Sequence, residues 1–228
     1  MKFAVIGLGY FGLNLALRLA EYGSEVMAID IDKNRVELIA NKVAHAVTLD
    51  STDKNALRHQ GIQDMDAVIV AIGEGFESSI TTTAVLQELK VKRILNRVTS
   101  PIHERLIGLM DIKEVLVPEA EAAEHLARRL MMPGLIESFQ ISINHSIFEV
   151  PAPKSIIGKK LIDTNLRDEF NLNLVTVKRV LEDKGLLTKG EKQIDTAAGV
   201  PKPDYIFHEH DILVLFGEDK DFQNFIES

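Results

Sequence analysis

Residues 3–12 read Phe-Ala-Val-Ile-Gly-Leu-Gly-Tyr-Phe-Gly, an apolar run that leads directly into the glycine series G-x-G-x-x-G. A helical pattern follows as far as Tyr22, so the glycines lie between an expected strand and an expected helix. In that setting Gly7 makes a tight turn, Gly9 lets a pyrophosphate approach the backbone, and Gly12 lets the helix pack closely on the strand. The stretch therefore predicts a dinucleotide-type binding site at a helix N-terminus, where free amides attract phosphate.

A carboxylate, Asp30, ends the second expected strand about 20 residues after the glycines, where it can accept hydrogen bonds from ribose hydroxyls. Its negative charge repels a 2′-phosphate, which disfavours NADP. The alternative is that the glycines only form a turn and that Asp30 caps the next helix. That alternative does not explain all four positions at their spacing, so we expect an adenine nucleotide here.

Residues 1–132 alternate β-rich apolar runs with helical patterns, which is typical of βαβ units. We expect an α/β domain with a doubly wound parallel sheet of the Rossmann type. The expected strands are Lys2–Ile6, Glu25–Ile29, Ala44–Leu49, Ala67–Ala71, Arg93–Asn96 and Glu114–Val117. The expected helices are Gly12–Tyr22, Asp32–Asn41, Ser78–Lys90, Pro101–Met110 and a further one that begins at Pro118.

The pair Pro133-Gly134 is the clearest break in the middle of the chain. We place the domain boundary there, between residues 1–132 and 135–228, since 228 residues suit two domains of about 100 to 150 residues. The second domain is expected to be a small α+β lobe. Its expected elements are strands at 139–143, 147–150, 174–181 and 211–216, a helix at 161–170 and a long hairpin loop at 184–203.

Composition narrows the function classes. The formal net charge of -8 argues against nucleic-acid binding, which draws on clustered excess lysine and arginine. The absence of cysteine removes disulfides and thiolate chemistry and fits a reducing cytoplasm. We expect no secretory signal, because a strand pattern begins at Lys2. The sequence also contains no run of about 20 apolar residues, the length that spans a bilayer. A membrane role would have to come through a partner.

Three further loops follow expected strands at the edge where open α/β sheets bind ligands. Asp50-Ser51-Thr52 follows the third strand, Ala71-Ile72-Gly73 follows the fourth, and Arg97 ends the fifth. Ser51 or Thr52 either contacts the adenosine or caps a helix. Gly73 either belongs to the site or only ends its strand, and Arg97 either pairs with a phosphate or is solvated.

A catalytic apparatus is missing from the sequence. The residues after the first domain form no evident substrate lobe, which a nicotinamide dehydrogenase needs. The seven histidines show no triad and no defensible metal spacing, including His208 and His210. We therefore expect that the chain is not an enzyme and that the nucleotide is a signal. A small NAD-dependent oxidoreductase is the alternative, and a nucleotide-binding protein unrelated to channels is a third hypothesis.

The whole chain resembles a known family. Residues 1 to about 130 resemble the nucleotide-binding half of RCK domains (regulators of potassium conductance), as in the Ktr and Trk potassium-uptake regulators, and residues 135–228 resemble the C-terminal RCK lobe. The order of both lobes makes the resemblance specific, because the first-lobe motifs alone suit other Rossmann proteins. The matching stretches are Phe3–Gly12, Ala28–Asp32, Asp64–Gly73, Val117–Glu119, Ile157–Leu161, Asn165–Arg167 and Asp211–Gly217.

The resemblance implies a cytoplasmic regulatory subunit that is peripheral to the inner membrane through a potassium channel or transporter. It implies dimers that assemble into an octameric ring, whose shape responds to ATP, ADP, AMP, NAD or NADH. It also implies the residues that line the nucleotide. These are Gly7, Gly9, Tyr10, Phe11, Gly12, Asp30, Ile31, Asp50, Ser51, Thr52, Ala71, Ile72, Gly73 and Arg97.

Two further sites are implied by the resemblance. Glu119 occupies a proline–glutamate position that can contribute to a divalent-cation site, or it is a favourable charge in the first turn of a helix. Some relatives bind cyclic di-AMP in the C-terminal lobe, where this chain has Asn165 and Arg167, although a helix cap and a surface arginine explain both residues equally well.

Tyr10 departs from the family pattern. Many Ktr-type proteins carry an arginine there that reaches the terminal phosphates, whereas tyrosine donates one hydrogen bond and brings no positive charge. A strong preference for ATP over ADP is therefore not expected. NAD, or a nucleotide with fewer phosphates, is favoured.

Overall fold

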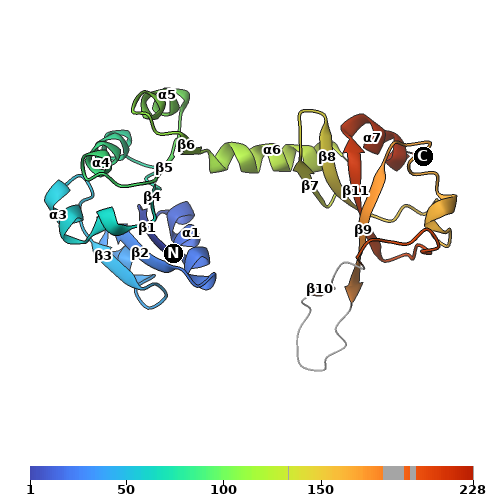
Figure 1. Ribbon diagram of the computed structural model, residues 1–228, viewed down its shortest axis with the longest axis horizontal. Coiled ribbons are helices and arrows are strands. Elements are labelled where there is room, and N and C mark those ends of the chain that lie inside the picture. Colours follow the sequence, from blue (N-terminus) through green and yellow to red (C-terminus); the bar gives the residue numbers. More distant parts are fainter. Residues whose placement is uncertain (133, 182–192, 196–198, 228) are drawn as a thin grey trace. The chain divides into compact units, whose positions relative to one another are not determined.

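The computed structural model describes residues 1–132, 134–181, 193–195 and 199–227. They form two compact units, Met1–Ala120 and Glu121–Ser228. Figure 1 shows the elements of each unit along the chain. The units divide within the helix that begins at Pro118, whereas the sequence places the domain boundary at the end of that helix. The boundary at residues 133–134 therefore stays a prediction.

The first unit contains a parallel six-stranded sheet in the order β3-β2-β1-β4-β5-β6 (Figure 1). This confirms the expected doubly wound α/β fold. The strand order reverses between β1 and β4, and open sheets of this type bind ligands beyond the carboxyl ends of the strands at such a point. The strands are β1 (Lys2–Ile6), β2 (Glu25–Asp30), β3 (His45–Thr48), β4 (Ala67–Val70), β5 (Ile94–Arg97) and β6 (Glu114–Leu116).

Two apolar clusters cover the faces of this sheet. One cluster includes Leu57, Leu86 and Ile107 from three helices, and the other includes Ala16 and Val36 from two more. All four residues of β4 are buried, as expected for a central parallel strand. The helical elements are α1 (Tyr10–Glu21), α2 (Lys33–Glu37), α3 (Lys54–His59), η1 (Ile62–Asp64), α4 (Phe76–Glu88), α5 (Pro101–Leu109) and α6 (Pro118–Met131).

The described part of the second unit is built on an antiparallel sheet in the order β10-β9-β11-β8-β7. Phe148 of β8 stacks on Phe222 with ring centroids 4.1 Å apart, and both rings are buried. This contact fixes the last helix against the sheet. The elements are β7 (Glu137–Gln140), β8 (His145–Pro151), η2 (Leu161–Asp163), β9 (Asn173–Leu181), β10 (Gln193–Asp195), β11 (Asp211–Glu218) and α7 (Asp219–Glu227).

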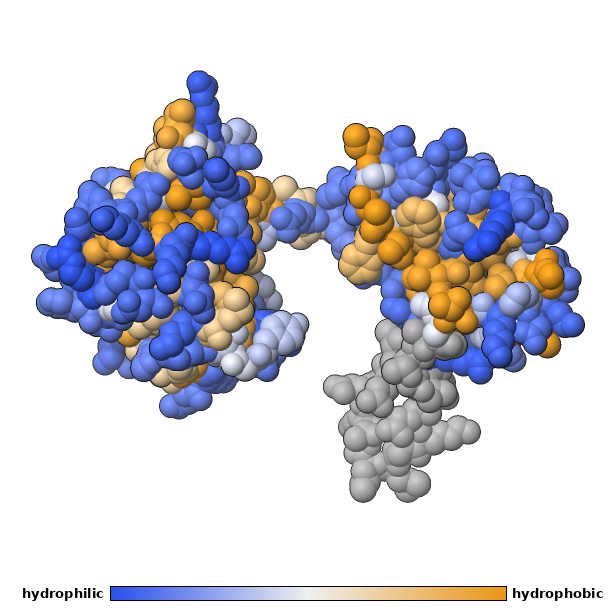
Figure 2. Space-filling view, in the orientation of Figure 1, coloured by the Kyte–Doolittle hydropathy of each residue, from blue (hydrophilic) through white to orange (hydrophobic). Residues whose placement is uncertain are grey.

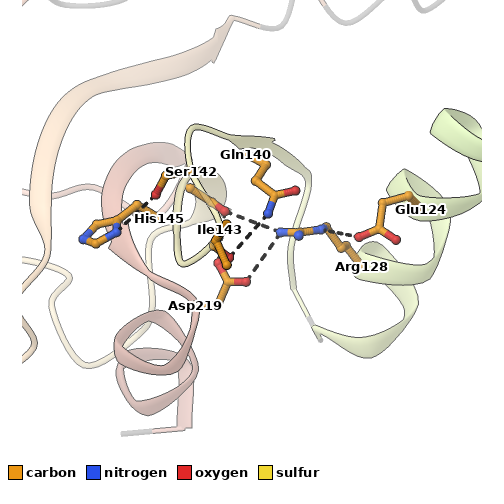
Figure 3. Close-up of polar contacts among 8 residues, drawn as sticks. Glu124, Arg128, Gln140, Ser142, Ile143, His145 and Asp219 are labelled. Carbon is orange, nitrogen blue, oxygen red and sulfur yellow. Dashed lines mark hydrogen bonds and ion pairs between the residues drawn. The ribbon is translucent and has the colours of Figure 1, made fainter. Parts of the chain in front are cut away.

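Arg128 fastens α6 within the second unit (Figure 3). Its guanidinium lies 2.9 Å from a carboxylate oxygen of Glu124, 3.4 Å from the Ser146 hydroxyl and 3.5 Å from Asp219. The Ser146 hydroxyl in turn donates to Asp219 at 3.0 Å. The C-terminal part of α6, β8 and the start of α7 are thereby joined by one polar cluster.

Two expectations for the second unit need correction. The helix expected at 161–170 is wrong, because only Leu161–Asp163 form a short 3-10 helix before turns begin. Asn165 has a φ of 51°, a left-handed conformation that a right-handed helix cannot continue through. Of the loop expected at 184–203, residues 184–192 and 196–198 lie outside the described residues, and Gln193–Asp195 form β10 paired with β9. Helices α3 and α7 were not expected.

In the described part of the chain, no helix is long and apolar enough to cross a membrane.

Candidate functional site

The glycine loop joins β1 to α1 at the centre of the sheet. Gly7 has a φ of +95°, and a Cβ there would lie 3.0 Å from the backbone nitrogen of Ile72. A Cβ at Gly12 would overlap the carbonyl oxygen of Gly7. Packing therefore requires both glycines. A Cβ at Gly9 would meet no atom within 4 Å, so the backbone at Gly9 faces open space that a ligand can enter.

Helix α1 begins in this loop without a side-chain cap. Gly9 is its N-cap and offers no side-chain oxygen to the first amides of the helix. The first turn also carries no acidic residue. Its amides are left for solvent or for an anion, and the helix dipole adds partial positive charge at the same place.

Asp30 holds the loop from the neighbouring strand. Its Oδ2 accepts a hydrogen bond from the Leu8 amide at 2.6 Å, and its Oδ1 accepts one from the Asp32 amide at 2.8 Å. The carboxylate is 6% exposed, and a guanidinium nitrogen of Arg35 lies 3.7 Å away. The N-cap of α2 is Asp32, which accepts from the Asn34 amide, so the alternative in which Asp30 caps that helix is wrong.

The loop after β3 presents one acidic side chain and buries its neighbour. Asp50 accepts hydrogen bonds from the hydroxyl of Thr52 at 2.7 Å and from its amide at 2.9 Å, and these bonds lower the pKa of Asp50 below its usual value. Ser51 is buried, and its hydroxyl bonds to that of Thr82 at 2.7 Å. Asp53 caps α3, so the alternative of a cap at Ser51 or Thr52 is wrong.

Arg97, at the end of β5, brings a positive charge to this edge of the sheet. Its side chain is 15% exposed and forms an ion pair with Glu119, so it is not a freely solvated arginine. Its guanidinium also lies over the Phe11 ring, 5.7 Å from the centroid. A Cβ at Gly73 would overlap the guanidinium, so this glycine makes room for Arg97 as well as ending a strand. The Nε of Arg97 is buried without a partner.

Glu119 lies in the first turn of α6. Its own backbone amide bonds to the carboxylate, and together with Arg97 this holds the pKa of Glu119 below its usual value, although some desolvation acts to raise it. The carboxylate therefore stays ionised at neutral pH. Across the residues that the structure describes, no group of three or more His, Asp or Glu side chains could by itself hold a metal ion.

The remaining expected site residues divide by exposure. Tyr10 is 90% exposed beside the glycine loop, and Ile31 is 70% exposed after β2. Ala71 is buried against the position of Gly12, so it packs the loop from beneath. The sequence reasoning did not single out Thr82, Thr83 and Asn96, although a Ser/Thr-rich stretch inside an expected helix is a signal for buried polar contacts.

A family model for the TrkA-N domain matches residues 3–118, which include the glycine loop, Asp30 and Arg97. The chain belongs to the TrkA-N domain family. Its relatives include two potassium uptake proteins of Bacillus subtilis (strain 168). Ktr system potassium uptake protein C is 34% identical over 224 residues, and protein A is 30% identical over 224 residues; each match covers 98% of this chain and 95% of the relative.

Solved structures similar to this TrkA-N protein show the same fold. The RCK domain of GsuK covers 100% of the chain with a TM-score of 0.64 at 16% identity, and the chain spans 48% of that protein's length. The GsuK channel bound to NAD covers 96% of the chain with a TM-score of 0.59 at 18% identity, across 38% of its own length. The resemblance to Ktr and Trk proteins with RCK domains is thereby confirmed.

The names of the relatives bear on whether the chain is an enzyme. Relatives that match the TrkA-N protein over nearly their full length are named for potassium uptake. The expectation that the chain is not an enzyme is therefore confirmed, and the oxidoreductase alternative is set aside.

Proposed function

We propose that this chain is the nucleotide-sensing regulatory subunit of a membrane potassium channel or transporter. The observation that carries the proposal is the open, uncapped start of α1 at Gly9, next to a loop that Asp30 clamps in place. Helix-start amides that no side chain caps fit a pyrophosphate. The neighbouring carboxylate fits ribose hydroxyls. The solved GsuK channel bound to NAD has the same fold and supports an adenine nucleotide.

The charges around the loop favour a nucleotide without a free triphosphate. The nearby arginines, Arg97 and Arg35, each lie beside a carboxylate, that of Glu119 and that of Asp30 respectively. Tyr10 adds no positive charge. Little cationic charge is left for a γ-phosphate. NAD, NADH, AMP and ADP therefore fit better than ATP alone, and ATP requires a divalent cation.

Glu119 would supply one carboxylate ligand to that cation, with phosphate oxygens of the nucleotide as further ligands. Its depressed pKa keeps it ionised for this role. A cation bound there would also draw Glu119 away from Arg97. Nucleotide and cation binding would then act at the start of α6, the helix that leads into the second unit.

A homo-oligomer is part of the proposal. Large apolar side chains are exposed on the second unit, where Figure 2 shows apolar surface. They include Phe139, Ile141 and Ile143, which are between 56% and 90% exposed, and Met131 of α6 at 77%. Clusters of this kind mark protein interaction sites. We assign them to contacts between copies in a dimer that assembles into an octameric ring beneath the membrane partner, in the cytoplasm.

Ligand-dependent switching follows if the nucleotide binds one ring conformation more tightly than another. Coupling of about 1 to 3 kcal/mol between sites is typical and corresponds to roughly 5- to 150-fold in affinity. Cyclic di-AMP at the C-terminal lobe is a separate proposal that rests on the family resemblance alone.

The test is calorimetric titration of the purified chain with NADH, ADP and ATP, together with light scattering and potassium flux measured with the partner transporter. We expect saturable binding, a large oligomer and flux that depends on the nucleotide. A stable monomer that is indifferent to all three nucleotides would contradict the proposal. Titration of the isolated C-terminal lobe with cyclic di-AMP tests the second ligand, and no heat of binding would rule it out.

A further inference from the structure

A set of buried polar side chains lies in the core of the first unit, among apolar residues of α4 and the neighbouring strands. Hydroxyl and amide groups are costly to bury unless each finds a hydrogen-bond partner. Four of these side chains are 0% exposed and the other, Ser51, is 8% exposed. The set consists of Ser51, Ser79, Thr82, Thr83 and Asn96.

Hydrogen bonds join these residues in two groups, Ser51 with Thr82, and Ser79, Thr83 and Asn96 with one another. The Thr82 and Ser51 hydroxyls lie 2.7 Å apart. The Asn96 amide donates to the Thr83 hydroxyl at 2.6 Å, and the Ser79 hydroxyl donates to the Asn96 carbonyl at 3.3 Å. The Thr83 hydroxyl also donates to the Ser79 carbonyl within α4 at 2.8 Å. Adjacent threonines on one helix thus reach two different segments of the chain.

Both segments carry residues of the proposed site. Ser51 is the buried residue between Asp50 and Thr52, which stand at the rim of the sheet. Asn96 directly precedes Arg97 on β5. Side chains of α4 therefore hold the loop after β3 and the end of β5 from the inside.

Stability alone does not account for this set. Replacing both partners of a buried hydrogen bond with apolar groups of similar shape is often nearly neutral, so an apolar interior would serve the fold as well. A fully bonded polar network instead fixes the geometry of the groups that it joins. The groups fixed here are the loop after β3 and the end of β5, which lie two strands to either side of β1 and its glycine loop in the sheet.

We propose that Thr82 and Thr83 are positioning residues of the nucleotide site. Thr82 holds the loop of residues 50–52 through Ser51, and Thr83 holds Arg97 through Asn96. The inference rests on the proposed function, because the ligand that benefits is the adenine nucleotide.

The experiment compares Thr82→Val, Ser51→Ala, the double variant and Thr82→Ser in the full chain. Each is titrated with NADH by calorimetry and unfolded in urea without nucleotide. We expect either single change to weaken NADH binding roughly threefold to tenfold, the effect of one lost hydrogen bond. The double variant should be no weaker than the single ones, since both remove the same bond. Thr82→Ser, which keeps the hydroxyl, should bind within about twofold of wild type.

The matched control is Thr164→Val, a buried threonine of the second unit whose hydroxyl bonds to the Leu161 carbonyl. It should leave NADH affinity unchanged. Lower unfolding stability with unchanged NADH affinity in both single variants would overturn the inference and leave the proposed function standing. If Thr82→Val does not fold, Ser51→Ala decides between these outcomes. A wild-type chain that binds no nucleotide contradicts the proposed function itself and this inference with it.

Discussion

The carboxylate of Asp30 accepts a hydrogen bond from the backbone amide of Leu8 at 2.6 Å. The residue that ends β2 therefore also holds the glycine loop that follows β1. One side chain thereby links the two parts of the nucleotide-binding motif, the glycine series and the acidic residue at the end of β2. The loop geometry and the proposed ribose contact depend on the same buried group.

Replacing this carboxylate should therefore affect stability and binding together. Asp30→Ala leaves the Leu8 amide without its partner, and we expect unfolding free energy to fall by about 1 to 3 kcal/mol, measured in urea. NADH affinity should fall at least tenfold by calorimetry, as expected from loss of a charge-assisted bond of about 1.5 to 3 kcal/mol. Asp32→Ala is the control, because it removes the cap of α2 and an ion pair with Arg35 but leaves the bond from the Leu8 amide to Asp30 in place. Equal losses of NADH affinity in both variants would show that Asp30 has no special role.

Substitutions at Gly12 and Gly9 should affect folding and NADH binding separately. Gly12→Ala places a methyl group on the Gly7 carbonyl, so we expect a marked loss of stability by thermal unfolding. Gly9→Ala meets no protein atom and has an allowed φ of -63°, so stability should change by no more than about 1 kcal/mol. The same methyl group blocks the approach of a pyrophosphate, and NADH binding should be lost. Normal NADH affinity in Gly9→Ala would mean that the ligand does not approach this backbone.

Divalent cations should matter for ATP through Glu119. Wild-type ATP affinity should rise when Mg²⁺ is added to an EDTA-treated sample, because the cation neutralises phosphate charge and Tyr10 has no positive charge to do so. In Glu119→Gln most of this rise should disappear, because an amide is a weaker ligand for the cation than a carboxylate. The NADH affinity of this variant, measured without the cation, should stay within about threefold of wild type. The measurement is calorimetry with and without Mg²⁺. An equal effect of Mg²⁺ on both proteins would remove Glu119 from the cation site.

The second unit should lose stability in acid through Asp211. Burial by itself raises the pKa of this carboxyl, but bonds from the Tyr205 hydroxyl at 2.6 Å, the His208 amide at 2.9 Å and Arg179 at 3.0 Å hold the pKa below its usual value. A carboxyl with a lowered folded pKa binds fewer protons folded than unfolded. Its stabilisation is present above the unfolded pKa of about 3.9 and is lost as pH falls through the folded pKa.

The measurement is the free energy of unfolding of the second unit, taken from its urea transition at a series of pH values from 7 down to 3, in wild type and in Asp211→Asn. Wild type should lose more stability below about pH 4 than the variant does, since the amide does not titrate. Parallel curves for the two proteins would assign the acid sensitivity to other groups.

Much of the first unit could be predicted from sequence because its signals are local. The six strands and the glycine loop follow from apolar runs and from glycine spacing, which short segments of chain determine by themselves. The pairing of Ser51 with Thr82 could not be predicted, since those residues are 31 positions apart and meet only through the fold. The ion pair of Arg97 with Glu119 is long-range in the same way.

The second unit was harder to predict. The apolar spacing of residues 161–170 predicts a helix, but Asn165 adopts a left-handed conformation that a right-handed helix cannot continue through. Helix α7 was missed because the segment is short and acidic, although Phe222 and Phe225 lie on one buried face at helical spacing.

A crystal structure of the full chain grown with NADH tests the central claim most directly. The account predicts the pyrophosphate over the amides at Gly9 and the start of α1, with the adenosine ribose within hydrogen-bond distance of Asp30. A structure with NADH bound elsewhere, or with no NADH at a saturating concentration, would contradict it.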